Sequence, residues 1–176
     1  MTFKLSEAVE ILERTPRTLQ AMLSGLSDGW LNRNEGEGTW NALEVVLHLI
    51  EAERTNWIPR LTFLLGEEAG TPFPPFDRFA NLDNPEQRTS ERIVNEFADS
   101  RARSLMKLKE MLTDENLLER KGVHPEFGPV RASELIATWA VHDLTHTAQI
   151  TRVLAVRYRS DVGPWIAYLS ILKSKS

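Results

Sequence analysis

Residues 135–153 read LIATWAVHDLTHTAQITRV, and this stretch has the spacing of a long helix with one buried face. Apolar and aromatic residues recur in it at intervals of three and four, which is the period of an amphipathic α-helix. The resulting stripe consists of Leu135, Trp139, His142, His146, Ile150 and Val153. We therefore predict a helix from about Ala132 to Tyr158, with two histidines in the middle of its buried stripe.

Three further long helices are expected upstream, because the same period recurs there. They run from about Ser6 to Leu26, from Thr39 to Leu64 and from Ser90 to Leu112. Ser6 and Thr39 are the expected N-caps of the first two. Pro16 should kink or split the first helix and Pro59 should bend the second, because proline lacks the N–H that an interior helical position donates.

The connections between these helices differ in length. Residues 66–88 break the helical period, and Phe73, Phe76 and Phe79 indicate an ordered loop that could cover a pocket. A second loop is expected at Lys121–Pro129, and Pro164-Trp165 can start a short closing helix. Without a recognisable strand, the pattern predicts an all-α chain: a four-helix bundle with a short C-terminal helix. At 176 residues, we expect a single domain spanning residues 1–176.

The composition excludes several classes of protein. Without cysteine, the chain has no disulfide framework, thiolate metal ligand or cysteine nucleophile. Its 21 Lys and Arg against 25 Asp and Glu give a net charge of −4, which argues against a surface for nucleic acid or an anionic membrane. We find no N-terminal signal and no apolar run near the roughly 18 residues of a spanning helix. We expect a cytoplasmic protein with no nucleic-acid or membrane partner.

His142 and His146 have the spacing of a metal-binding pair. Residues four apart on a helix stack one turn above the other, so two imidazoles can reach one metal ion at about 2.0–2.1 Å. The alternative is a pair of core histidines, each hydrogen-bonded to a neighbour. Two buried imidazoles need partners for four ring nitrogens, which a shared cation would supply compactly. The spacing alone leaves both interpretations open.

The other two histidines are less informative. His48 lies off the apolar arc of its helix, beside residues such as Glu44 and Glu51, so periodicity predicts that it faces solvent. His124 precedes a proline in a turn-like segment, where it would be a loop residue or lie at the rim of a site.

Three stretches of the chain carry ordered motifs. They are Gly38-Thr-Trp-Asn-Ala-Leu-Glu-Val-Val-Leu-His48-Leu-Ile-Glu-Ala-Glu53, His124-Pro-Glu-Phe-Gly-Pro-Val130 and Leu135-Ile-Ala-Thr-Trp-Ala-Val-His142-Asp-Leu-Thr-His146-Thr-Ala-Gln-Ile150. With these stretches the chain resembles the DinB-like superfamily of metalloenzymes: the first is similar to the family signature W-s-x-x-E-v-l-x-H-l-x-x-x-E and the third to W-x-x-H-D-x-x-H-x-x-Q-I. The resemblance implies a four-helix bundle, often dimeric, with a three-histidine metal site. Carried over by position, the ligands are His48, His142 and His146, which overrides the solvent-facing interpretation of His48.

Three neutral imidazoles would leave a divalent ion its full charge and an open coordination position, as in catalytic sites. All-nitrogen ligation suits Zn, Ni or Fe and discriminates poorly among them. Glu44, Glu51 and Asp143 are the candidate carboxylates, either as partners that orient a ligand or as a catalytic base. Gln149 neighbours the site, although amides in bundles often bond across helices instead.

Several functions fit such a site. The resemblance implies a metal-dependent transferase that activates a low-molecular-weight thiol, which this cysteine-free chain would take from a cosubstrate. The alternatives are a hydrolase that uses metal-bound water, or a non-enzymatic metal-binding stress protein. Either enzyme would act on a small-molecule substrate. A homodimer is also expected from the resemblance, with the first helix or Trp165-Ile166-Ala167-Tyr168-Leu169 as possible interface.

Overall fold

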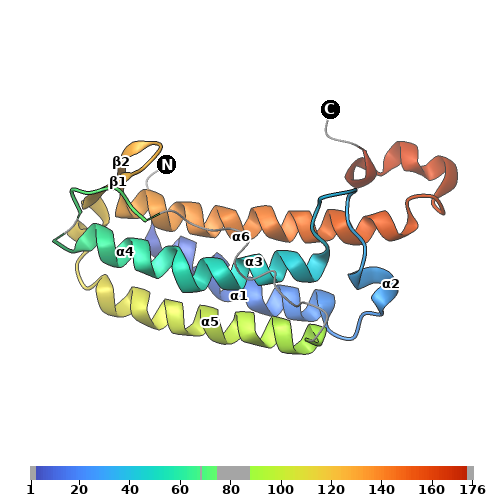
Figure 1. The fold of residues 1–176 in the computed structure, drawn as a ribbon, viewed down its shortest axis with the longest axis horizontal. Coiled ribbons are helices and arrows are strands. Elements are labelled where there is room, and N and C mark those ends of the chain that lie inside the picture. Colours follow the sequence, from blue (N-terminus) through green and yellow to red (C-terminus); the bar gives the residue numbers. More distant parts are fainter. Residues whose placement is uncertain (1–2, 68, 75–87, 174–176) are drawn as a thin grey trace.

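The computed structural model describes residues 3–67, 69–74 and 88–173, which form a bundle of long helices lying side by side (Figure 1). The bundle helices are α1 (Leu5–Leu23), α3 (Ala42–Thr55) with α4 (Trp57–Leu65), α5 (Ser90–Met111) and α6 (Ala132–Ala155). α4 continues the direction of α3, so the two together occupy one position in the bundle (Figure 1). α1 packs against α5 and α6, and α3 packs against the same two helices. The predicted all-α four-helix bundle is confirmed.

Short elements connect and extend the long helices. They are α2 (Asp28–Leu31), the strands β1 (Lys121–His124) and β2 (Gly128–Arg131), and the 3₁₀ helices at Glu115–Glu119, Val156–Tyr158, Gly163–Tyr168 and Ser170–Leu172. The closing helix expected near Pro164 is thus a 3₁₀ turn with the proline in its first turn. None of the described helices is long and apolar enough to cross a membrane.

The loop predicted at Lys121–Pro129 is instead a hairpin, so the expectation that no strand forms is wrong here. β1 and β2 pair antiparallel, with Lys121 opposite Arg131 and His124 opposite Gly128. Gly128 has φ 73°, a conformation open to glycine that closes the turn. Each strand has four residues, the shortest run by which a strand is recognised, and each contains a glycine, which is uncommon in strands.

α1 begins at Leu5 with Lys4 at its N-cap, so the expected cap at Ser6 is wrong by two residues. The helix ends at Leu23, earlier than expected. Pro16 lies inside this single helix and does not split it. A proline at this position leaves the carbonyl of Leu12 without its intrahelical donor, and the structure supplies another donor, described below.

The N-cap of α3 is Asn41, whereas the sequence predicted Thr39 as the cap of this helix. Asn41 Oδ1 accepts from the Glu44 N–H at 2.9 Å, and Glu44 Oε2 accepts from the Asn41 N–H at 2.7 Å, which makes a complete capping box. The helix breaks at Asn56 and not at Pro59. Pro59 occupies the first turn of α4, where its missing N–H costs little because the first N–H groups of a helix have no acceptor within it.

The core consists of two apolar clusters at opposite ends of the bundle. One includes Leu19, Phe97 and Ile150, and the other includes Leu12 and Ala140. On α1, α5 and α6, polar residues separate the two clusters along the helix. These polar stretches meet in the middle of the bundle, where the candidate site lies.

Phe73 is the described member of the three loop phenylalanines, and it is part of the core. It is 3% exposed, and its ring lies edge-on to Phe63 with centroids 5.8 Å apart. Its backbone N–H donates to the carbonyl of Val123. Phe76 and Phe79 lie outside the described residues, so the predicted pocket cover stays a prediction for them.

Candidate metal centre

The structure brings three histidines together from two helices. His48 comes from the middle of α3, and His142 and His146 come from successive turns of α6. His142 Nε2 lies 3.2 Å from His48 Nε2 and 3.1 Å from His146 Nε2. Each histidine offers one ring nitrogen as a ligand atom, and these three nitrogens lie within 4.8 Å of one another.

His48 is 5% exposed, so the periodicity-based prediction that it faces solvent is wrong and the placement implied by the family resemblance is right. The reason is that α3 has no solvent-facing side at this height: every residue from Val45 to Glu53 is buried. The indole of Trp40 also packs on the His48 ring, with centroids 4.9 Å apart. A helical wheel cannot separate the faces of a helix that is enclosed all round.

Gln149 fixes the protonation of His146. Its Oε1 lies 2.8 Å from His146 Nδ1, and an amide oxygen can only accept, so Nδ1 carries the proton. His146 Nε2 therefore presents a lone pair toward His142. Gln149 Oε1 is thus bonded within its own helix, to a residue three positions earlier.

The contacts at His142 Nε2 cannot both be hydrogen bonds. An imidazole nitrogen has one in-plane position, which holds either a proton or a lone pair. A proton on His142 Nε2 can be donated to His48 or His146, and a lone pair there would face the lone pair of His146 at 3.1 Å. Three lone pairs around one cation remove this conflict.

Burial keeps the α6 pair neutral. The pKa of His142 is lowered to about 3, chiefly by desolvation and further by the charges of His146, His48 and Arg101. Desolvation also lowers the pKa of His146, against the opposing effects of Gln149 and Asp143. Neutral imidazole is the form that ligates a metal ion.

The residues present fit a metal ion. Nitrogen ligands bind a divalent transition metal at about 2.0–2.1 Å, so two of them on one ion lie roughly 3 Å apart, close to the two Nε2 separations observed. His142 Nδ1 is buried and has no hydrogen-bond partner among the described residues. A proton on that nitrogen is what ligation through Nε2 requires, so the donor set and its tautomers are consistent with a shared cation.

The three candidate carboxylates do not join the histidines. Glu44 belongs to the capping box of α3. Glu51 is 4% exposed, and its Oε2 lies 3.3 Å from Nη1 of the exposed Arg54. Asp143 is fully buried, and both of its oxygens accept from Arg101 instead of from an imidazole.

His124 lies apart from this cluster and has a local role in the hairpin. Its Nδ1 accepts from the backbone N–H groups of Glu126 and Phe127, at 3.1 and 3.3 Å. The Phe127 ring stacks on it, with centroids 4.5 Å apart. Desolvation and the nearby charge of Arg60 lower its pKa, which favours the neutral ring that these bonds need.

Sequence reasoning missed the buried polar residues beside the histidines. Arg101 is 1% exposed, and its guanidinium joins Glu53 and Asp143. Trp139 Nε1 donates to the same Glu53 at 3.0 Å. A signal for Arg101 was available, because it recurs at intervals of four and three with Phe97 and Ser104 on the buried stripe of α5.

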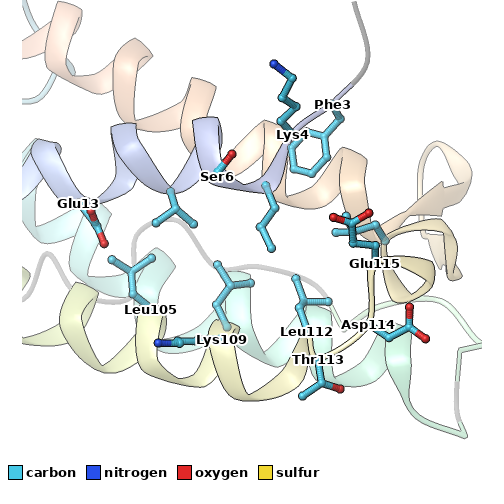
Figure 2. A pocket seen from close by; sticks show the side chains of 14 residues that line it. Phe3, Lys4, Ser6, Glu13, Leu105, Lys109, Leu112, Thr113, Asp114 and Glu115 are labelled. Carbon is cyan, nitrogen blue, oxygen red and sulfur yellow. The ribbon is translucent and has the colours of Figure 1, made fainter.

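A cavity of about 700 Å³ lies elsewhere, between the start of α1 and the end of α5 (Figure 2). Figure 2 shows Phe3, Leu105 and Leu112 on its walls and Lys109 and Glu115 beside it. None of the histidines or candidate carboxylates lines it.

Comparisons with known proteins agree with this architecture. The chain is 24% identical over 151 residues to the protein named "Putative metal-dependent hydrolase OB0413" from Oceanobacillus iheyensis, with 86% of each chain covered. Its fold is similar to that of YfiT from Bacillus subtilis, which is described as "a probable metal-dependent hydrolase with an unusual four-helix bundle topology". That similarity has a TM-score of 0.71 at 21% identity and covers 86% of both chains. The model of the DinB superfamily matches residues 11–150, and the chain therefore belongs to the DinB superfamily.

Proposed function

We propose that His48, His142 and His146 hold one divalent metal ion and that the chain is a metal-dependent hydrolase of small molecules. The observation that carries the proposal is the meeting of three Nε2 atoms at His142, where hydrogen bonding cannot satisfy both contacts. The names of the Oceanobacillus relative and of YfiT support a hydrolase. A divalent ion on three neutral imidazoles supplies Lewis acidity and lowers the pKa of a coordinated water toward about 7.

The protein's part in such a reaction is to hold the ligands and to accept a proton. Gln149 keeps the His146 lone pair on Nε2, so the ring needs no reorganisation. Of the three candidate carboxylates, Glu51 is held by the longest bond, and we propose it as the group that accepts a proton. It lies one helical turn from His48, and its ion pair with the exposed Arg54 is long at 3.3 Å. Glu44 and Asp143 are held by shorter structural bonds.

A thiol transferase is the second candidate, with the same three ligands and a thiolate supplied by a cosubstrate. The observation that favours it is the engagement of Glu44 and Asp143 in structural bonds, because a thiolate attacks without a protein base. The cysteine-free sequence requires that such a sulfur come from outside the chain.

Metal content tests the site first. We would measure it by elemental mass spectrometry after reconstitution with Zn, Ni or Fe, for wild type and for His48→Ala, His142→Ala and His146→Ala. Near-stoichiometric metal in wild type and its loss in each variant is expected. His124→Ala is the matched control, because it removes a histidine outside the cluster and should keep the metal. A wild type that takes up no metal would overturn the proposal.

Turnover then separates the chemistries. Ester, amide and phosphoester substrates would be screened with and without added thiol, using Glu51→Gln as the base variant. Metal-dependent hydrolysis without thiol, reduced in Glu51→Gln, is expected. Turnover that requires a thiol and is unaffected by Glu51→Gln would favour the transferase. Metal binding without any turnover, together with unfolding on chelation, would indicate a structural metal.

A further inference from the structure

Arg101 lies at the point where α1, α3, α5 and α6 meet, and all of its hydrogen-bond donors are used. Its Nε and Nη2 donate to Glu53 Oε1 at 3.0 and 2.7 Å. Its Nη1 and Nη2 donate to the two oxygens of Asp143 at 2.5 and 2.9 Å. The remaining Nη1 proton goes to the carbonyl of Leu12 at 2.9 Å. A guanidinium has five N–H donors, and here each has an acceptor.

The bond to Leu12 explains how α1 tolerates Pro16. In a regular helix the N–H of residue 16 would donate to the carbonyl of residue 12, and proline has none. Arg101 supplies the missing donor from another helix. The proline and the arginine are therefore complementary: Pro16 leaves a buried carbonyl without a donor, and Arg101 donates to it.

The cluster also joins the two helices that carry the histidines. Glu53 is on α3, five residues after His48. Asp143 is on α6, directly after His142 and three residues before His146. Trp139, also on α6, donates to Glu53 Oε1. The relative height and rotation of α3 and α6 determine the separation of the histidine nitrogens, and this buried bridge fixes both.

We propose that Arg101 is a positioning residue of the histidine centre, which sets the separation of His48 from His142 and His146 by tying Glu53 of α3 to Asp143 of α6. The inference rests on the proposed metal binding and adds to it a residue that touches none of the ligands. Holding Glu53, Asp143 and the Leu12 carbonyl together requires the five donors of the planar guanidinium and not its charge alone, because a lysine ammonium has only three donors.

Three variants of this cluster test the proposal. Arg101→Lys keeps the charge and removes the fork. Arg101→Met leaves two buried carboxylates unpaired and is expected to fold poorly. The triple variant Glu53→Gln, Arg101→Met and Asp143→Asn removes every charge together, which buried ion clusters often tolerate. Arg103→Met is the matched control, because Arg103 is an exposed arginine on the same helix and, within the described part of the chain, its side chain bonds Ser100 and not the buried carboxylates.

The first measurement is the Zn²⁺ dissociation constant, obtained by chelator competition on protein shown to be folded by circular dichroism. We expect it to rise about 10- to 100-fold in Arg101→Lys and in the triple variant, the usual effect of removing groups that orient ligands, and to stay unchanged in Arg103→Met. Wild-type affinity in either folded variant would overturn the positioning role. In Arg101→Lys it would show that a positive charge without the guanidinium fork is sufficient, and in the triple variant it would show that the ionic bridge is not needed.

The second measurement needs no metal. Long-range ¹H–¹⁵N spectra of metal-free protein report which ring nitrogen of each histidine is protonated. The wild type should show a single tautomer at His48 and His142, whose Nε2 atoms lie 3.2 Å apart across α3 and α6, and this should become a mixture in the triple variant. His146, whose tautomer is fixed by Gln149 on its own helix, should stay protonated at Nδ1 in both proteins. If wild type binds no Zn²⁺, the proposed function fails while this result still decides the positioning role. If wild type binds Zn²⁺ and the ring spectra of the triple variant match wild type, only the positioning role fails.

Discussion

At the scale of single residues, the three imidazoles are oriented by different means. His146 is held by a hydrogen bond from Nδ1 to Gln149. His142 is held by packing, because the ring of Trp57 meets it edge-on with centroids 5.1 Å apart. His48 lies against Trp40. The His146 ring therefore depends on a single polar partner that can be removed without changing the apolar packing.

Replacing Gln149 by leucine should weaken metal binding, because the His146 ring loses the acceptor that fixes its tautomer. We expect the Zn²⁺ dissociation constant to rise about 10- to 100-fold. Gln149→Glu, which keeps an acceptor at the same reach, should bind at least as tightly as wild type. Chelator competition measures both, with Gln20→Leu on α1 as a control, since Gln20 makes an exposed bond to Asn95. Equal affinity in Gln149→Leu and wild type would contradict this role.

The Pro16–Arg101 pair predicts a thermodynamic coupling. Arg101→Met leaves the carbonyl of Leu12 without a hydrogen-bond donor. Pro16→Ala supplies a backbone N–H that can donate to this carbonyl within α1. Pro16→Ala should therefore recover part of the stability lost in Arg101→Met, by roughly 1–3 kcal/mol, the cost of a buried group without a partner. In the wild-type background, where Arg101 already bonds the Leu12 carbonyl, Pro16→Ala should raise the free energy of unfolding by less. A double-mutant cycle by urea unfolding measures the coupling, and additive effects would contradict it.

At the scale of secondary-structure elements, the start of α3 explains what Glu44 does. The side chain of Glu44 bonds the backbone of Asn41, and the Asn41 side chain bonds the backbone of Glu44. This reciprocal cap sets where the helix begins and hence the position of His48 two turns later. Glu44 thus helps to place His48 by fixing the start of α3.

Asn41→Ala should destabilise the fold by about 1 kcal/mol through loss of this cap, which for a chain of this size lowers Tm by roughly 2–4 °C. Glu44→Gln should keep both stability and metal content, because glutamine serves equally well at the third helical position. Thermal unfolding and elemental analysis test the two variants together. A folded Glu44→Gln protein that loses turnover would instead place Glu44 in the chemistry.

The bundle itself could be predicted from the sequence, because the period of three to four is strong in α5 and α6. The ends of the helices were less predictable. Asn56 breaks a helix whose sequence remains apolar on both sides of the break, so the apolar period does not mark where the first segment ends. The hairpin at Lys121–Arg131 is too short to show a strand period.

The candidate site was predictable only in part. The spacing of His142 and His146 shows directly in the sequence, whereas His48 was placed by the family resemblance against its own helical wheel. Arg101 and Glu53 were missed because a charged residue on a wheel is ordinarily assigned to solvent. Their burial depends on partners that come from other helices, a pairing that no single helix displays.

At the scale of the whole molecule, an ionic layer divides the core into two apolar clusters. Glu53 and Asp143 face one guanidinium, so the layer carries one negative charge in excess when all three groups are ionised. Burial raises the pKa of Glu53, and Arg101 only partly opposes this effect. The ionised carboxylate of Glu53 is therefore less stable in the fold than in the unfolded chain.

This shift predicts how stability depends on pH. Below about 4.5, Glu53 is protonated in both states and contributes no difference. As the pH rises from there through the higher pKa of the folded state, the fold holds a proton that the unfolded chain releases, so the free energy of unfolding falls. Relative to wild type, Glu53→Gln should become steadily more stable across this window and then level off. Urea unfolding in the presence of chelator, at pH values from about 4.5 to 7.5, measures the difference. A constant or opposite difference would contradict the raised pKa.

The packing of Trp40 against His48 has a practical consequence. An indole whose ring centroid lies 4.9 Å from that of a candidate ligand is close enough for its fluorescence to respond to the electronic state of the imidazole. A paramagnetic ion at the three nitrogens would quench this emission strongly, whereas Zn²⁺ would mainly shift it. Trp165, which is 68% exposed on the closing 3₁₀ turn, provides an emission that reports solvent instead. Trp57 also lies against His142, so a Trp40→Phe variant would identify which part of a metal-dependent change in emission comes from Trp40.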